Sequence, residues 1–194
     1  MKILGIDPGS SRTGYGLITD KPLKLVASGV INLKEKDPNK KIIKLAAEYE
    51  AVLKKFKPDL AAIEKLFFSR NVKTAIEVSQ ARGVLVYLTL KNKVALIEYG
   101  PMQIKQTIAN YGLADKKAVA KMVSAILKIA PIKGFDDISD AIAIAITAAN
   151  NAPYSQSHWH QNAVSYTSRN TRERSVIKSF IEKIRFIKNV TKKY

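Results

Sequence analysis

Cysteine is absent from the 194-residue sequence, and histidine occurs only as His158 and His160. Without cysteine, a disulfide framework, thiolate-bound zinc, an iron–sulfur cluster and thiol catalysis are all excluded. A histidine-based triad would have to use this one short stretch. We interpret the two histidines as surface residues, because their polar segment offers no further metal ligands.

Long hydrophobic runs are also missing. The longest strongly apolar stretch is Ala141–Ala149, far short of the roughly 20 residues that span a bilayer. Met1–Ile6 does not resemble a signal peptide, since an Asp-Pro-Gly sequence interrupts the apolar run at once. We therefore expect a cytoplasmic protein without a membrane partner.

Acidic residues are scarce relative to basic ones. The sequence has 33 Lys and Arg against 16 Asp and Glu, a formal net charge of +17. An excess of this size favours a polyanionic partner, and with a membrane set aside the favoured partner is nucleic acid.

The chain length suits one domain with an appendage, and the composition shifts near Asn150. We expect a core domain over residues 1–150 and a basic extension over residues 151–194, in which nine Lys and Arg face two Glu. The extension begins with a polar arm and continues as an amphipathic helix. The apolar stripe of that helix consists of Val176, Ile177, Phe180, Ile181, Ile184 and Ile187.

The apolar pattern of the core predicts an α/β protein, with three early strands followed by alternating helices and strands. Gly14 and Gly16 are interpreted as turn or bulge positions, and Asp115 as a helix N-cap. The predicted strands are Lys2–Ile6, Tyr15–Thr19, Leu25–Leu33, Leu60–Ile63 and Val94–Tyr99. The predicted helices are Asn39–Phe56, Val72–Leu90, Met102–Asn110, Lys116–Ile129 and Ile138–Ala149.

Four carboxylates stand where predicted strands end or the last core helix starts. Asp7 and Glu64 follow buried strands, and Asp137 and Asp140 share one face of that helix. Strand ends and helix starts meet at one rim of an α/β sheet, where ligands usually bind. Carboxylates gathered there repel one another unless a cation compensates, and Mg²⁺ prefers such oxygen ligands. Two ions about 4 Å apart would support phosphodiester hydrolysis.

Each of these acids also has a purely structural interpretation. Asp7 could open an Asp-Pro-Gly turn, and Glu64 could be a solvated strand end. Asp137 could cap the helix with Asp140 in its first turn, or Asp136 could be the cap and leave Asp137 free. The spacing alone leaves these alternatives open.

Five segments together resemble the RuvC family of Holliday-junction resolvases. They are Lys2–Gly16 (KILGIDPGSSRTGYG), Ala62–Asn71 (AIEKLFFSRN), Gln80–Gly83 (QARG), Gln103–Thr107 (QIKQT) and Asp137–Thr147 (DISDAIAIAIT). The resemblance implies a ribonuclease-H-like mixed five-stranded sheet flanked by helices. It also implies a homodimer that nicks two symmetric strands of a four-way DNA junction with two Mg²⁺ ions per site, Mn²⁺ serving as a substitute. The catalytic and metal-binding acids would be Asp7, Glu64, Asp137 and Asp140, and a RuvA–RuvB branch-migration complex would be the partner.

The DNA contacts that the resemblance suggests are Phe67, Arg70, Arg82, Lys105 and Lys116. Phe67 would stack on a base at the junction centre, although the residue pattern alone fits a core position equally well. From the residues alone, the simpler interpretation of each basic residue is a plain solvated charge, because the chain is so basic.

Two other functions compete with the nuclease hypothesis. The segment from Gly5 to Ser10 also resembles the phosphate loop of actin-like ATPases and sugar kinases, but the chain has no room for their second half. A non-catalytic DNA-binding module would explain the charge but not the acids, because carboxylates facing phosphates weaken binding.

Overall fold

The computed structural model describes residues 1–66, 72–132, 134 and 136–151. Its centre is a mixed five-stranded sheet of order β3-β2-β1-β4-β5. β2 pairs antiparallel with β1 and β3, whereas β4 runs parallel to β1 and β5. The strands are β1 (Lys2–Pro8), β2 (Arg12–Asp20), β3 (Leu23–Asn32), β4 (Leu60–Glu64) and β5 (Ala95–Tyr99). The mixed five-stranded sheet that the family resemblance implies is confirmed.

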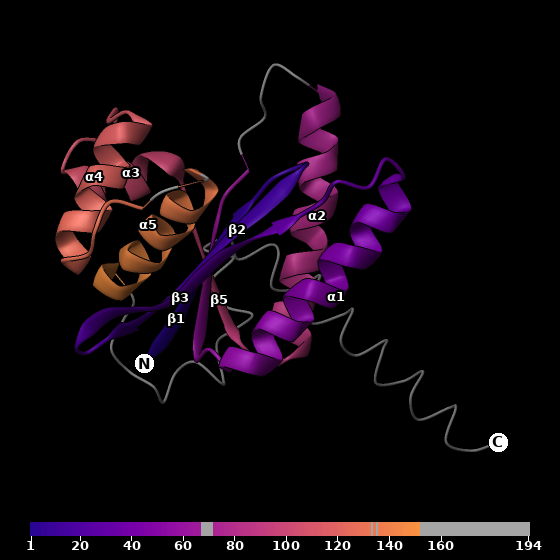
Figure 1. The fold of residues 1–194 in the computed structure, drawn as a ribbon, viewed down its shortest axis with the longest axis horizontal. Coiled ribbons are helices and arrows are strands. Elements are labelled where there is room, and N and C mark those ends of the chain that lie inside the picture. The colour runs from indigo at the N-terminus through magenta and orange to yellow at the C-terminus, as the bar shows by residue number, and fades with distance from the viewer. Residues whose placement is uncertain (67–71, 133, 135, 152–194) are drawn as a thin grey trace, which may run out of the picture. The chain divides into compact units, whose positions relative to one another are not determined.

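Helices cover both faces of this sheet (Figure 1). α1 and α2 pack against each other on one face, α5 lies along β1 and β2 on the other, and α3 and α4 pack against α5. The helices are α1 (Pro38–Phe56), α2 (Val72–Lys91), α3 (Pro101–Ala109), α4 (Lys116–Leu127) and α5 (Asp136–Asn151). In the described part of the chain, no helix is long and apolar enough to cross a membrane.

The pleat of β1 and β4 decides which side chains reach α5. Ile6 belongs to the hydrophobic core under α1 and α2, while Gly5 meets the backbone of α5. Because side chains alternate between faces along a strand, Asp7 lies on the α5 face. On β4, Ile63 lies in the same core as Ile6 and pairs with it, so the following Glu64 lies on the α5 face beside β1.

Local signals set the ends of the helices. Asp37 precedes α1 and accepts a hydrogen bond from the backbone N–H of Asn39 at 2.8 Å, with Pro38 in the first turn. α1 ends at Phe56, and the following Lys57 has a left-handed φ of 47°. Asp115 accepts from the backbone of the first turn of α4, which confirms its predicted role as an N-cap.

Glycines in β1 and β2 let α5 touch the sheet backbone directly. A Cβ added to Gly5 would stand 2.0 Å from the carbonyl oxygen of Ala141, and one added to Gly14 would stand 2.0 Å from that of Asp137. Gly16 likewise lies against Ile142 of α5. The interpretation of Gly14 and Gly16 as turn or bulge residues is therefore wrong, because both lie within β2 and serve this close approach.

The predicted elements agree with the structure in number and order, and their ends differ by a few residues. β1 and β2 extend toward each other to Pro8 and Arg12, so the turn between them is short. The arm and amphipathic helix predicted for residues 151–194 lie outside the described residues, apart from Asn151 at the end of α5.

Candidate active site

The four predicted carboxylates come from three elements that meet on the α5 face of the sheet. Asp7 lies near the end of β1 and Glu64 ends β4, and these two strands are neighbours in the sheet. Asp137 and Asp140 lie in the first turns of α5, which packs on β1 and β2. Each of Asp140, Glu64 and Asp137 acts electrostatically on Asp7, so the structure brings the set together around that residue.

Each acid of α5 is bound to a basic side chain. Arg12 Nε donates to Asp137 Oδ2 at 2.8 Å, and Lys116 Nζ donates to Asp140 Oδ2 at 3.0 Å. Arg12 begins β2 and Lys116 begins α4, so the two cations come from different elements that pack against α5. The hydrogen bond from Lys116 to Asp140 is the leading cause that raises the pKa of Lys116.

Asp7 carries the largest electrostatic penalty of the four acids. Burial, followed by the charges of Asp140, Glu64 and Asp137, raises the pKa of Asp7 from 3.8 to about 8, against a smaller opposing effect of Lys116. Burial and the charge of Asp140 likewise raise the pKa of Glu64, while Lys116 and Lys105 act to lower it. The nearby positive charge therefore does not offset the burial and mutual repulsion of the ionised carboxylates.

The chemistry of these donors fits a hard divalent cation, since all four are carboxylates and the central one is strained electrostatically toward its protonated form. The positions of the four side chains, however, do not yet form a metal site. Among the residues that the structure describes, no three acidic or histidine side chains are already grouped closely enough to hold an ion. Asp137 and Asp140 are bound to Arg12 and Lys116 instead, so metal binding requires these side chains to rearrange.

The predicted DNA contacts fall into three groups. Lys116 and Lys105 lie beside the carboxylates, where both act on the pKa of Glu64. Arg82 lies on α2 and binds within the protein, to the carboxylate of Glu98 and to the carbonyl oxygen of Glu64 at 3.4 Å. A phosphate contact by Arg82 stays a prediction. Phe67 and Arg70 lie outside the described residues.

Sequence reasoning missed Arg12 as a member of this site. Its pairing with Asp137 joins residues 125 positions apart, which no local pattern shows. The available signal was its place five residues after Asp7, at the start of β2 and directly after the short turn that leads from β1.

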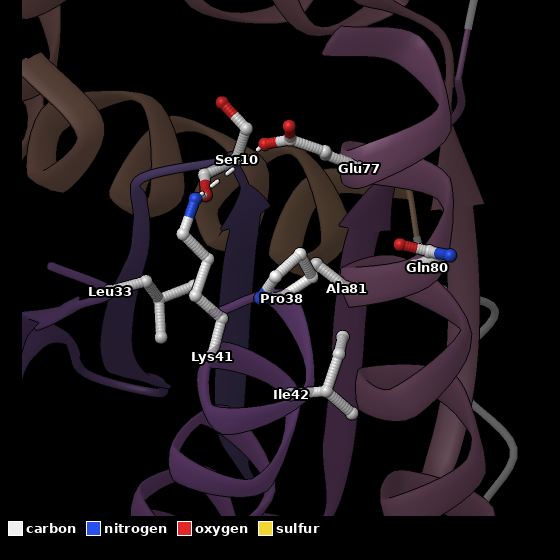
Figure 2. A pocket seen from close by; sticks show the side chains of 8 residues that line it. All are labelled: Ser10, Leu33, Pro38, Lys41, Ile42, Glu77, Gln80 and Ala81. Atoms are coloured by element: carbon white, nitrogen blue, oxygen red, sulfur yellow. Dashed lines mark hydrogen bonds and ion pairs between the residues drawn. The ribbon is translucent and has the colours of Figure 1, made fainter. Parts of the chain in front are cut away.

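The same turn is also attached to the opposite face of the sheet. Figure 2 shows Lys41 of α1 between the backbone of Ser10 and the carboxylate of Glu77 on α2. Lys41 Nζ lies 3.4 Å from the Ser10 carbonyl oxygen and 3.6 Å from Glu77 Oε2. This contact holds the turn that follows Asp7 onto the two helices behind the sheet.

Comparisons with known proteins identify the family of this chain. Residues 3–148 match the family model described as "Crossover junction endodeoxyribonuclease RuvC". The RuvC protein of Caldicellulosiruptor saccharolyticus is 40% identical over 150 residues, which cover 75% of this chain and 90% of that protein. The RuvC protein of Thermosipho melanesiensis is 43% identical over 148 residues, covering 75% and 94% of the two chains.

Solved structures give the same result. The structure described as "T. thermophilus RuvC in complex with Holliday junction substrate" has a TM-score of 0.71 and 33% identity, and the match covers 77% of this chain and 93% of that one. The yeast mitochondrial Holliday junction resolvase Ydc2, at 18% identity and a TM-score of 0.58, shares the fold. The chain therefore belongs to the crossover junction endodeoxyribonuclease RuvC family, a family of metal-dependent nucleases and thus of hydrolases.

Proposed function

We propose that this protein resolves four-way DNA junctions during recombination and repair by metal-dependent hydrolysis of phosphodiester bonds. The observation that carries the proposal is a cluster of four carboxylates where β1 and β4 end beside the start of α5, namely Asp7, Glu64, Asp137 and Asp140. Within this cluster the pKa of Asp7 is raised to about 8. Family membership favours the nuclease over the ATPase and the non-catalytic DNA-binding module. The charge of +17 supports a DNA substrate.

Asp7, Glu64, Asp137 and Asp140 would hold the metal ions, and Mg²⁺ is the proposed ion because it prefers oxygen ligands, with Mn²⁺ as a substitute. Two bound ions supply an activated water and stabilise the leaving oxygen. The protein itself fixes the carboxylates on two strands and one helix. Lys105 and Lys116 add positive charge beside them, suited to holding the DNA backbone at this edge.

Paired nicks require two active sites, and we propose a homodimer that uses α2. The exposed side of α2 carries Ile76, Tyr87 and Leu90, which are 54%, 63% and 46% exposed. A groove lined by Gly83, Val84 and Tyr87 of α2 and by residues of α1 runs beside them. A second copy of the chain would cover these apolar side chains and relate two active sites by a twofold axis, as two symmetric strands require. The RuvA–RuvB complex stays the proposed branch-migration partner on family resemblance.

The domain boundary is also a proposal. Residues 1–150 would form the nuclease domain, and residues 151–194 a basic arm and amphipathic helix toward flanking DNA. Deleting residues 151–194 is expected to leave junction cleavage intact while weakening binding and reducing its salt dependence, because fewer counterions are released. An insoluble truncated protein would show that the extension is part of the core.

Replacing Asp7 by Asn tests the catalytic assignment. The change keeps the side-chain shape and removes a central ligand, so cleavage of a synthetic four-way junction with Mg²⁺ should fall by several orders of magnitude. Junction binding in Ca²⁺ should persist, because loss of a negative charge does not weaken attraction to phosphate. Glu48→Gln, on α1 and remote from the site, is the matched control and should cleave normally. Normal nicking by the Asn variant would overturn the assignment.

A further inference from the structure

Arg12 lies at the carboxylate site, although no pattern in the surrounding sequence predicts this position. It is the first residue of β2 and lies two positions before Gly14, so both face α5. Gly14 touches the backbone of Asp137. The sheet thus presents the Arg12 side chain to the first turn of α5, where its Nε lies 2.8 Å from Asp137 Oδ2.

The Arg12–Asp137 ion pair is accessible to solvent. The side chain of Arg12 is 44% exposed and that of Asp137 is 22% exposed. A pair of this exposure stabilises a protein by only about 0.2–1 kcal/mol, so a stronger partner of the carboxylate can displace the arginine.

Charge balance indicates what such a partner would be. Arg12 and Lys116 each form an ion pair with one acid of α5, and two further carboxylates, those of Asp7 and Glu64, stand in the same cluster. Two divalent ions would balance four carboxylates without either basic residue. The guanidinium would then no longer be needed to neutralise Asp137, and its planar set of N–H donors matches a phosphate group.

We propose that Arg12 is an exchangeable partner of Asp137, which competes with the divalent metal in the DNA-free protein and transfers to a phosphate of the bound junction when metal is loaded. Arg12 is a positioning residue in this scheme. It holds Asp137 while the site lacks metal, and it helps hold the DNA backbone when Asp137 serves the metal. The inference rests on the proposed metal-dependent nuclease function.

Metal titration of the DNA-free, full-length protein tests the competition directly, with Mn²⁺ binding followed by electron paramagnetic resonance. Arg12→Gln should bind Mn²⁺ about 1.4- to fivefold more tightly than the wild type, the range that corresponds to losing an exposed ion pair. The same variant should bind the junction more weakly in Ca²⁺. The slope of log affinity against log salt should become shallower by about one, as expected for one lost phosphate contact.

Two further variants separate the possible explanations. Lys44→Gln removes another exposed ion pair, with Glu35, and should leave Mn²⁺ affinity unchanged. In an Asp137→Asn background, Arg12→Gln should give no additional gain, because the competed carboxylate is already gone. If Arg12→Gln still tightens Mn²⁺ binding in that background, the arginine acts on the metal through its general electrostatic field and does not compete for Asp137. The proposed exchange would then be overturned.

The remaining outcomes are equally distinct. Unchanged or weaker Mn²⁺ binding by Arg12→Gln would overturn the competition, and an unchanged salt slope would overturn the transfer to phosphate. If Asp137→Asn alone leaves Mn²⁺ affinity unchanged, the metal-ligand assignment under the proposed function is wrong, and the inference falls with it. Weakened Mn²⁺ binding by Asp137→Asn combined with no effect of Arg12→Gln would refute the inference while leaving the proposed function intact.

Discussion

The raised pKa of Asp7 predicts an unusual pH dependence of stability for the metal-free protein. This carboxyl ionises near pH 3.8 in its unperturbed state and near pH 8 in the folded protein. Between these values the folded state binds one proton more than the unfolded state, so the free energy of unfolding falls as the pH rises. Its contribution is complete below pH 3.8 and lost above about pH 8.

The slope of this effect is about 1.4 kcal/mol per pH unit. Asn does not titrate, so the Asp7→Asn variant lacks this slope while it retains the contribution of Glu64, whose pKa is also raised. The unfolding free energy of the variant minus that of the wild type should therefore grow by about 3 kcal/mol between pH 5 and pH 7. Taking the difference at each pH cancels every group that titrates alike in both proteins.

Urea unfolding in EDTA at pH 5, 6, 7 and 8 measures this difference, provided that both proteins show the same m value. Glu48→Gln, an exposed change on α1, should give a difference that is flat across the range. A flat difference for Asp7→Asn as well would mean that Asp7 is ionised without penalty in the folded protein. The reasoning from burial and crowded charges would then be refuted.

Three other substitutions test the packing beside the site and the backbone geometry at the end of α1. Gly14→Ala forces a Cβ to within 2.0 Å of the Asp137 carbonyl oxygen, and its urea unfolding free energy should fall by about 3 kcal/mol or more. Lys57→Gly relieves a φ of 47°, so a thermal scan should show stabilisation by about 1 kcal/mol, and a lower melting temperature would contradict this. Arg82→Ala removes the contact with the Glu64 carbonyl oxygen and should lower the unfolding free energy by about 1–3 kcal/mol and slow junction cleavage.

The elements of the fold could be predicted because their signals are local. Alternation, helical periodicity and turn residues act over a few positions, and an acid directly after a buried strand, as at Asp7 and Glu64, is visible in the same way. Gly14 was misinterpreted because a glycine in a turn and one beneath a crossing helix look alike in sequence. Contacts between distant elements carry no local signal, as with Arg12 and Asp137 or Arg82 and Glu98.

The contact of α5 with the glycines of β1 and β2 has a consequence for how such a protein can evolve. The spacing between Asp7 and the α5 acids is set by backbone contact, because Gly5 and Gly14 have no side chain that would separate the strands from α5. The large aliphatic residues that pack under α1 and α2 lie on the other face of the sheet. Substitutions can accumulate in that layer over generations without altering the separation of the acids, whereas each glycine admits almost no replacement.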